Sequence, residues 1–519
     1  MTTEPPSSPS PQSEQPREQP REQPREQPRE QPSEQPSIVS TDPADNNAMH
    51  PDVNANPGFW QLLLLGFQHV LACYAGAVAV PLFVGYALVQ AGKMDPSYIP
   101  HLITADLLVA GIATIVQSIG VWRFGVRLPL IQGCTFSAAI PMVTIGSQYG
   151  LAAVYGSVIC SGIFIILFAP LFSRLLRFFP PLVTGTVLLI IGLTLMPVAA
   201  DWVGGSTAAK ADGTFGSGRN IGIAMGVLLL ILLIERFGPG WLARISVLVG
   251  MVVGFLVCIP LGMVNFDGIH HANWVGVTRP VNFGLQFQPA AIIAMCIVSL
   301  VTMVEATGDV LAIGEATQTP ITKRRIADAL RADGFATVLG GCMNTFQYTA
   351  FAQNIGVLSI TGVKSRYVTA SAGGILIVLG LLPKAAEVIA AIPAPVLGGA
   401  GIALFGTVAA SGVRTLSKVT FTNTNIWVVA VPTALALLPA VCPNLFSTMP
   451  ASLQTFLSSG ICIGAVAAII LNLLFNTGRN APTEQAGKPA AHDAPRGGEF
   501  GVDDADDDGK GDEPELPDE

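Results

Sequence analysis

Residues 181–200 read PLVTGTVLLIIGLTLMPVAA, an apolar run that contains no charged side chain. About 20 such residues are enough for a helix to cross the ~30 Å hydrocarbon core of a membrane. The small residues of the run follow the spacing P-x3-G-x6-G from Pro181, and the same spacing starts again at Pro395, 214 residues later. The run therefore predicts a membrane-spanning helix, and its recurrence predicts an internal repeat.

Apolar segments of this kind follow one another from residue 57 to residue 478. We predict fourteen of them, in an all-α integral membrane protein. They cover approximately residues 60–90, 101–121, 127–146, 150–172, 181–200, 219–236, 242–266, 289–315, 331–343, 351–362, 366–391, 395–413, 424–441 and 452–476. The ninth and tenth are too short to cross alone, and prolines and a glycine interrupt the third. Broken segments at membrane depth are tolerated where they line a cavity inside the protein, so segments 3 and 10 indicate the functional site.

The repeat connects the two broken segments. Adding 214 residues to the interrupted part of the third segment gives residues 341–360, which overlap the tenth. Because this offset corresponds to seven segments, the second half would cross the membrane in the opposite orientation to the first. We therefore expect a 7+7 inverted repeat, an architecture that places a substrate site near the membrane midplane between broken helices.

The two ends of the chain are polar. Residues 14–37 repeat Glu-Gln-Pro-Arg and end in Glu-Gln-Pro-Ser, and a proline in every copy prevents a continuous helix. We predict that residues 1–56 and residues 479–519 are disordered cytoplasmic tails, and that the first is not a cleaved secretory signal because it lacks an apolar run. The tails hold eight basic and 23 acidic residues, a net charge of −15, whereas the body holds 19 basic and 12 acidic residues, a net charge of +7. The acidic character of the chain therefore belongs to its tails.

The basic residues between the segments lie mainly on one side of the membrane. If the N-terminus is cytoplasmic, the inner loops hold fourteen Lys and Arg residues and the outer loops hold five. Because cytoplasmic loops generally carry the excess of basic residues, we expect both termini in the cytoplasm.

No pattern in the sequence is typical of an enzyme. The eight cysteines lie in or beside apolar runs, without a CxxC pair and without a histidine at metal-ligand spacing. We therefore expect small buried thiols, no metal site and no cofactor. A transporter surrounded by the lipid bilayer, without a nucleic-acid partner, is favoured over a membrane enzyme.

Ionisable side chains deep in the apolar segments are rare, and their costly burial makes them candidates for function. Glu305 and Asp309 lie within residues 292–313 and are four residues apart, so they share one helix face and direct two carboxylates into one cavity. Two carboxylates in a medium of low dielectric constant do not both ionise easily, so one of them can carry a proton. A structural hydrogen bond between helices is the alternative for both.

Two further ionisable residues are candidates. His69 is the only histidine at clear membrane depth, where it would either tie two helices together or contact a ligand. Asp333 begins the ninth segment, and its alternative is a carboxylate at a helix N-terminus, where the helix dipole favours negative charge.

The tenth segment opens with two adjacent amide side chains, Gln353 and Asn354. Their donors and acceptors, together with the free backbone N–H groups of a helix start, match a neutral, planar, amide-like ligand better than an inorganic ion. Phe136 in the third segment would stack on such a plane, or would be an ordinary apolar side chain.

Residues 353–362 read QNIGVLSITG, which resembles the Q-N-x-G-x4-T-[RKG] signature of the nucleobase–ascorbate transporter family, also called nucleobase:cation symporter-2. Gln68-His69, Glu305 and Asp333 match other marked positions of this family. The resemblance covers approximately residues 57–478 and is strongest to the bacterial xanthine and uric acid permease branch.

The resemblance implies a homodimer in which a core domain moves against a gate domain to carry nucleobases with protons or sodium ions. The core would comprise approximately residues 57–172 and 289–391, and the gate approximately residues 181–266 and 395–476. The resemblance also implies the residues of the site: the substrate would be bound by Glu305, Gln353, Phe136, Ala352 and Asn354, and the proton-coupling network would comprise Glu305, Asp333, His69 and Asp309.

The resemblance also bears on the substrate. Members that carry uracil are similar to one another in having Glu at the position of Gln353 and often His at the position of Asp309. The amide of Gln353 can donate to a carbonyl and accept from an N–H of an oxidised purine. We therefore expect proton-coupled uptake of xanthine, uric acid or both across a bacterial cytoplasmic membrane.

Some alternatives stay open at this stage. Gln347 and Ile355 depart from the residues that many relatives carry, so the choice between xanthine and uric acid is not decided. The alternatives in function are a uracil or pyrimidine:proton symporter of the same family and an anion transporter on the same fold. The central carboxylate Glu305 argues against the anion transporter.

Overall fold

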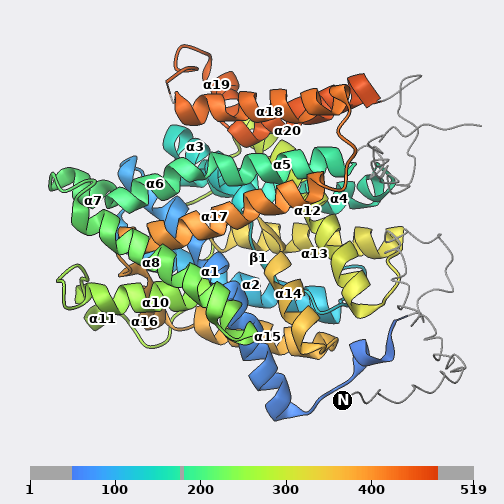
Figure 1. Cartoon of the computed structure of the whole chain (residues 1–519), viewed down its shortest axis with the longest axis horizontal. Helices are drawn as coiled ribbons and strands as arrows, with labels where there is room; N and C mark the ends of the chain where they lie inside the picture. The colour runs from blue at the N-terminus through green and yellow to red at the C-terminus, as the bar shows by residue number, and fades with distance from the viewer. Residues whose placement is uncertain (1–48, 176–179, 443, 477–519) are drawn as a thin grey trace, which may run out of the picture.

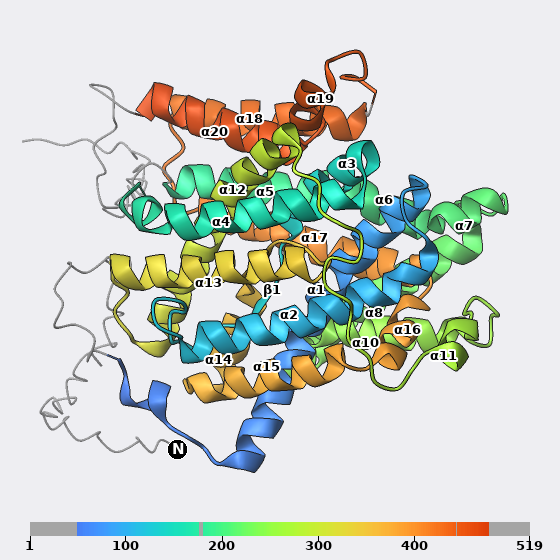
Figure 2. The same cartoon turned by 180° about the vertical axis from the view of Figure 1, so that it is seen from behind.

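The computed structural model describes residues 49–175, 180–442 and 444–476, so most of both predicted tails lies outside the described residues. The described part is mostly helical and contains one small sheet (Figures 1 and 2). The α-helices are α1 (Phe59–Gln90), α2 (Ile99–Ile119), α3 (Ala139–Tyr149), α4 (Leu151–Leu175), α5 (Pro181–Thr194), α6 (Met196–Gly204), α7 (Ser206–Ala211), α8 (Gly218–Phe237), α9 (Gly240–Ala243), α10 (Ser246–Cys258), α11 (Asp267–His271), α12 (Pro289–Thr317), α13 (Lys323–Cys342), α14 (Ala352–Thr361), α15 (Arg366–Gly380), α16 (Pro383–Ala390), α17 (Ala394–Leu416), α18 (Asn423–Val441), α19 (Ala451–Leu457) and α20 (Gly460–Asn476). The strands are β1 (Gln132–Cys134) and β2 (Tyr348–Ala350), and the 3-10 turns are η2 (Pro51–Asn54), η3 (Pro96–Tyr98) and η4 (Phe136–Ala138).

Eight helical stretches among the described residues are long and apolar enough to cross a membrane. They are α1, α2 together with η3, α4, the pair α5 and α6, α8, α12, α17 and α18. A ninth stretch consists of α15 and α16, which are bent by 82° relative to each other, and α10 and α20 are shorter apolar helices. The described chain is therefore a multi-pass helical body, as the apolar segments predict.

The predicted ninth segment is longer in the structure than the sequence indicates. We expected residues 331–343, too short to cross alone, whereas α13 begins at Lys323 and has 20 residues. Its first turns carry Lys323, Arg324 and Asp328, so the hydropathy of the segment rises only after the helix has begun. This correction also places Asp333 in the middle of a helix rather than at its N-terminus.

The sheet is a departure from the expected all-α fold. β1 and β2 pair antiparallel, with Gln132 opposite Ala350 and Cys134 opposite Tyr348. Each strand has three residues, too few for an alternating pattern to appear in the sequence. The pairing partners are more than 200 residues apart, so no local signal announces them.

The last residues of the predicted N-terminal tail pack against the body. The turn η2 places Val53 in a fully buried position, and Ser365 Oγ donates a hydrogen bond of 2.6 Å to the Ala55 carbonyl. The apolar Val53 and the short 3-10 turn explain why this part of the polar segment is held. In the structure, ordered chain therefore begins before residue 57.

Helices from the two halves of the chain pack in pairs: α2 along α15, α4 along α13 and α5 along α17 (Figures 1 and 2). Glycines lie at the closest points. A Cβ added at Gly111 of α2 would lie 2.5 Å from the carbonyl oxygen of Gly373 in α15, and one added at Gly162 of α4 would lie 2.8 Å from the carbonyl oxygen of Gly334 in α13. Such small residues let helix backbones approach closely, which is a main source of helix association in membranes.

The repeated P-x3-G-x6-G spacing provides a matched pair for testing this packing. A Cβ at Gly192 would collide with the backbone of Ala409, whereas a Cβ at Gly406 would have no neighbour closer than Met196 Cε at 4.0 Å. We predict that Gly192→Ala lowers the free energy of unfolding by about 1–3 kcal/mol through overpacking. Gly406→Ala should leave it unchanged or slightly higher, because alanine is the better helix former. Unfolding of the purified protein in detergent measures both variants, and equal stability of the two would contradict the packing described here.

Candidate functional site

The two strands bring the predicted broken segments together in the interior. The pairing extends beyond the sheet, because Phe351 N donates to Ile131 O at 3.0 Å and Thr135 N donates to Gln347 O at 2.9 Å. After β1 the chain enters η4 and α3, and after β2 it enters α14. The starts of two short helices therefore lie at one crossing, with Phe136 on one side and Gln353 on the other.

Glycines make room for this crossing. The Phe351 ring lies against Gly133 of β1, where an added Cβ would overlap the ring. An added Cβ at Gly76 of α1 would be 3.8 Å from Gln353 Nε2, so the Gln353 amide lies beside this helix. Gln353 is exposed, so its amide is free to meet a ligand. α14 ends at Thr361, and the next residue, Gly362, has a φ of 66°, a left-handed conformation that favours glycine and accounts for the Thr-Gly end of the signature.

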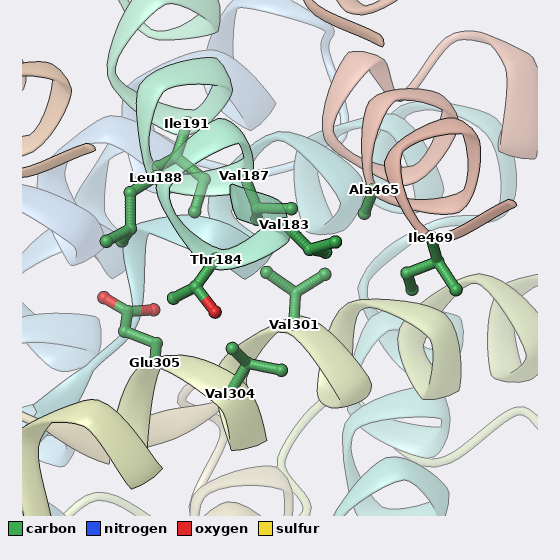
Figure 3. A pocket seen from close by; sticks show the side chains of 10 residues that line it. All are labelled: Val183, Thr184, Val187, Leu188, Ile191, Val301, Val304, Glu305, Ala465 and Ile469. Carbon is green, nitrogen blue, oxygen red and sulfur yellow. The ribbon is translucent and has the colours of Figure 1, made fainter. Parts of the chain in front are cut away.

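Glu305 of α12 reaches the crossing from a third direction. Ser137 Oγ in η4 donates a hydrogen bond of 3.0 Å to Glu305 Oε2. Glu305 is half-buried and lies at one edge of a narrow cavity between α5, α12 and α20 (Figure 3). The other residues that line this cavity are mainly aliphatic: Val183, Thr184, Val187, Leu188, Ile191, Val301, Val304, Ala465 and Ile469. Glu305 is thus the one ionisable residue of this lining, and Thr184 supplies its other polar side chain.

Three carboxylates lie close enough for their charges to interact. Asp309 is half-buried one turn beyond Glu305 on α12, and it interacts electrostatically with both Glu305 and Asp333. Asp333 of α13 is buried, and its Oδ1 accepts hydrogen bonds from Gln132 Nε2 at 2.7 Å and from Gln117 Nε2 at 3.4 Å. Neighbouring carboxylates in a medium of low dielectric constant favour a shared proton, so the geometry suits proton binding.

The two amides at the start of α14 have different environments. Asn354 is fully buried, and its Nδ2 donates a hydrogen bond of 2.6 Å to the Pro129 carbonyl. His69 of α1 is also buried and lies beside the Asn354 side chain. Asn354 and His69 therefore tie α14 to α1 and to the chain before β1, which fits a supporting role more closely than direct contact with a ligand. Ala352 is the first residue of α14, so its backbone lies at the crossing.

Phe136 faces the opposite half of the protein. It is half-buried, and its ring makes an edge-to-face contact with Phe405 of α17, with centroids 5.5 Å apart. Phe136 therefore precedes Ser137, which bonds to Glu305, and its ring contacts an aromatic side chain of α17.

Asp106 is a further buried carboxylate, which was not among the predicted site residues. Asp106 of α2 is fully buried, and its Oδ1 accepts hydrogen bonds from Tyr348 Oη at 2.6 Å, from Thr345 Oγ1 at 3.4 Å and from the Cys134 thiol. These donors lie on β1, on β2 and just before β2, so the carboxylate holds both strands. The sequence did contain an indication of this residue, because Asp106 is a charged residue inside the second apolar segment. The same kind of observation identified Glu305 as a candidate.

Gln347, which departs from the usual residue of the relatives, also has a defined place. Its Nε2 donates to Thr302 Oγ1 at 2.7 Å and to Ser299 Oγ at 3.2 Å, both on α12. It therefore connects the chain before β2 to the helix that carries Glu305.

The Ser137–Glu305 contact makes a specific prediction. Ser137→Ala removes the only donor that holds Glu305 Oε2 among the described residues, at a cost of about 0.5–1.5 kcal/mol for one hydrogen bond. We expect the apparent KM for uptake to rise about two- to tenfold, with protein abundance unchanged. Ser157→Ala is the matched control, because its hydroxyl bonds only to the Val154 carbonyl of its own helix. An unchanged KM in Ser137→Ala would show that Ser137 has no role in the substrate site.

Comparison with solved structures identifies the class of fold. The transmembrane domain of a cyanobacterium bicarbonate transporter, BicA, is 16% identical, and the match covers 80% of this chain and 98% of that one with a TM-score of 0.50. The murine Solute Carrier 26 family member A9 anion transporter in the inward-facing state is 12% identical, with 82% and 70% coverage and a TM-score of 0.51. The chain thus has the fold of a class of membrane transporters.

Comparison of sequences identifies the family. The profile described as "Permease family" matches residues 60–445. The nucleobase transporter PlUacP of Paenibacillus larvae is 43% identical over 82% of this chain and 96% of its own length. The uric acid transporter UacT of Escherichia coli is 42% identical over 81% and 87%, and the xanthine permease of Bacillus subtilis is 41% identical over 81% and 94%. The chain belongs to this permease family, the nucleobase:cation symporter-2 family, in its bacterial xanthine and uric acid permease branch.

The family membership confirms the resemblance drawn from the sequence. The relatives are transporters and permeases, so the expectation of a multi-pass membrane transporter rather than an enzyme is also confirmed.

Proposed function

We propose that the chain takes up an oxidised purine base, xanthine or uric acid or both, together with protons across a bacterial cytoplasmic membrane. Support comes first from relatives of about 40% identity that are named for these substrates. The observation that carries the proposal is the Ser137–Glu305 hydrogen bond, which holds a carboxylate at the crossing that also carries the exposed Gln353 amide. A carboxylate and an amide together can pair with the N–H and C=O groups around an oxidised purine.

We propose that the body crosses the membrane fourteen times. The nine apolar stretches, the shorter helices α10 and α20, and α13 would supply twelve membrane spans. Each of the two remaining spans would combine a strand with a short helix, β1 with α3 and β2 with α14.

The pairing of helices supports an inverted 7+7 repeat. In such a repeat a two-fold operation would exchange α2 with α13 and α4 with α15. The contact of α2 with α15 would then become the contact of α13 with α4, and both contacts are present. Both also depend on a reciprocal glycine pair, Gly111–Gly373 in one and Gly334–Gly162 in the other. The two-fold operation would also exchange β1 with β2 and α5 with α17. Each of these two contacts would therefore be mapped onto itself.

In this arrangement both termini would be cytoplasmic. Arginines of one proposed inner loop and of the first turns of α13 gather around Asp328, which contacts Arg331 and lies 4.0 Å from Arg123 and 3.9 Å from Arg324. An accumulation of arginine at one end of the body is typical of the cytoplasmic side.

The proposed transport cycle uses the residues of the crossing. Facing outward, the network of Glu305, Asp309 and Asp333 takes up a proton, and Glu305 and Gln353 pair with the purine while Phe136 packs on its plane. The core domain, which holds these residues, then moves against the gate domain and releases purine and proton inside. His69 and Asn354 hold α14 in position during this movement, and the protein works as a homodimer.

Uptake measurements test this proposal. Cells that express the chain should accumulate labelled xanthine or urate, and a protonophore should abolish the accumulation. Hypoxanthine and uracil, tested in parallel, should be poor substrates. Accumulation of uracil without xanthine or urate would favour a pyrimidine symporter, and exchange of inorganic anions alone would favour an anion transporter.

A further inference from the structure

Four aromatic side chains form a row that leads away from the crossing. Phe136 contacts Phe405 with centroids 5.5 Å apart, Phe405 contacts Trp202 at 6.3 Å, and Trp202 contacts Phe83 at 6.1 Å. Two of the three contacts are edge-to-face, as aromatic pairs prefer. The two outer rings of the row come from the proposed core (η4 and α1) and the two middle rings from the proposed gate (α17 and α6), so the row spans the boundary between them.

The far end of the row opens into a cavity. This cavity has a volume of about 210 Å³ and lies between the end of α1 and the start of α6 and α7. Its lining combines aromatic and polar side chains: Phe83, Tyr86, Ala87, Gln90, Pro197, Val198, Asp201, Trp202 and Ser206. In the proposed orientation it opens to the outside.

The middle of the row lies between this cavity and the crossing. Phe405 is fully buried and Trp202 is 4% exposed, so the two rings pack tightly against their neighbours. Movement of the proposed core against the gate would separate Phe136 and Phe83 from Phe405 and Trp202. The two gate rings are therefore placed to act as a barrier between an outer and an inner position for the substrate.

The outer cavity has the chemistry that a planar purine requires. Trp202 and Phe83 line it with the small exposed parts of their rings, which a flat heterocycle can contact. The Gln90 amide and the Asp201 carboxylate lie at its rim and can pair with the C=O and N–H groups of the same heterocycle. Asp201 also pairs with Lys210 of α7, which fixes the carboxylate at this position.

We propose that this outer cavity binds the purine before the barrier of Trp202 and Phe405 opens and admits it to the site at Glu305 and Gln353. The inference rests on the proposed function and adds a second, outer binding position to it. The outer position holds the base while the carrier is still closed, so that opening is followed by transfer over a short distance along aromatic surfaces.

The test is protection of an engineered cysteine by substrate. Ala87→Cys, in the lining of the cavity, is labelled on whole cells with a membrane-impermeant maleimide, in a Cys442→Ser background that removes the exposed native thiol. Labelling is repeated with xanthine or urate, and then in combination with Glu305→Ala and Gln353→Ala, which remove both groups proposed to pair with the purine at the inner site. Lys93→Cys is the matched control, since it is exposed just beyond the same helix but does not line the cavity.

We expect the purine to slow labelling of Ala87→Cys about tenfold at a concentration about ten times its Kd. Protection should persist in the Glu305→Ala, Gln353→Ala background and be absent at Lys93→Cys. Protection that disappears in that background would overturn the outer site, because it would show a conformational response to binding at the inner site. Absence of protection in a chain that accumulates purine would overturn it equally, while leaving the proposed function intact. Loss of purine uptake by the unmodified chain would instead contradict the proposed function.

Discussion

Replacing Glu305 by Gln is expected to abolish the accumulation of purine against its gradient. Glutamine has nearly the same shape, and its amide oxygen can still accept the hydrogen bond from Ser137 Oγ. It cannot exchange a proton, so the network formed with Asp309 and Asp333 loses the group that faces the cavity. The purine could still equilibrate across the membrane, but its entry would no longer be coupled to the pH gradient.

The measurement compares accumulation of labelled purine at imposed pH gradients in the original chain and in Glu305→Gln. The internal concentration should exceed the external one only in the original chain. Glu315→Gln is the matched control, because Glu315 is an exposed carboxylate on the same helix. Normal pH-driven accumulation in Glu305→Gln would show that Glu305 is not the proton-coupling residue.

The second large effect is expected for Asp106→Ala. The substitution removes the carboxylate that accepts from the Tyr348 hydroxyl, the Thr345 hydroxyl and the Cys134 thiol. The Tyr348 hydroxyl keeps only the backbone carbonyl of residue 106, at 3.1 Å, as an acceptor on α2. A buried donor without a partner costs about 1–3 kcal/mol, and several share the loss here. We expect the free energy of unfolding to fall by about 3–5 kcal/mol and uptake to be lost, because both strands of the crossing lose their anchor.

Two further variants separate positioning from stability. Asp106→Asn keeps an oxygen acceptor for Tyr348, so it should fold and retain reduced uptake with a raised KM. Asp212→Asn, in an exposed loop, should have no effect on either quantity. If Asp106→Ala transported purine with an unchanged KM, Asp106 would have no part in positioning the crossing.

The sequence located the functional region more reliably than it described its geometry. Segments 3 and 10 were marked by the Pro and Gly interruptions and by the length of the apolar runs, and the structure places β1 and β2 within or beside them. The paired strands themselves could not be predicted, because their partners are far apart in the chain and each strand is very short. Gln117 and Gln132, whose amides donate to Asp333, could not be predicted either. They are far from Asp333 in the chain, and a single amide in an apolar run has no distinctive pattern.

Helix geometry explains why the sequence could not show which amide of the Gln353–Asn354 pair is exposed. Adjacent residues on a helix point about 100° apart, since there are 3.6 residues per turn. Gln353 is therefore exposed, whereas Asn354 is buried against the Pro129 carbonyl. A sequence shows both amides but does not show which of them faces the cavity.

Reconstitution tests the central proposal most directly. Purified protein in liposomes, with an alkaline interior and no sodium gradient, is given labelled xanthine or urate. We predict accumulation above the external concentration, its collapse on addition of a protonophore, and its absence in Glu305→Gln liposomes. Accumulation that follows a sodium gradient without a pH gradient, or that occurs equally in Glu305→Gln, would contradict proton-coupled purine uptake through this site.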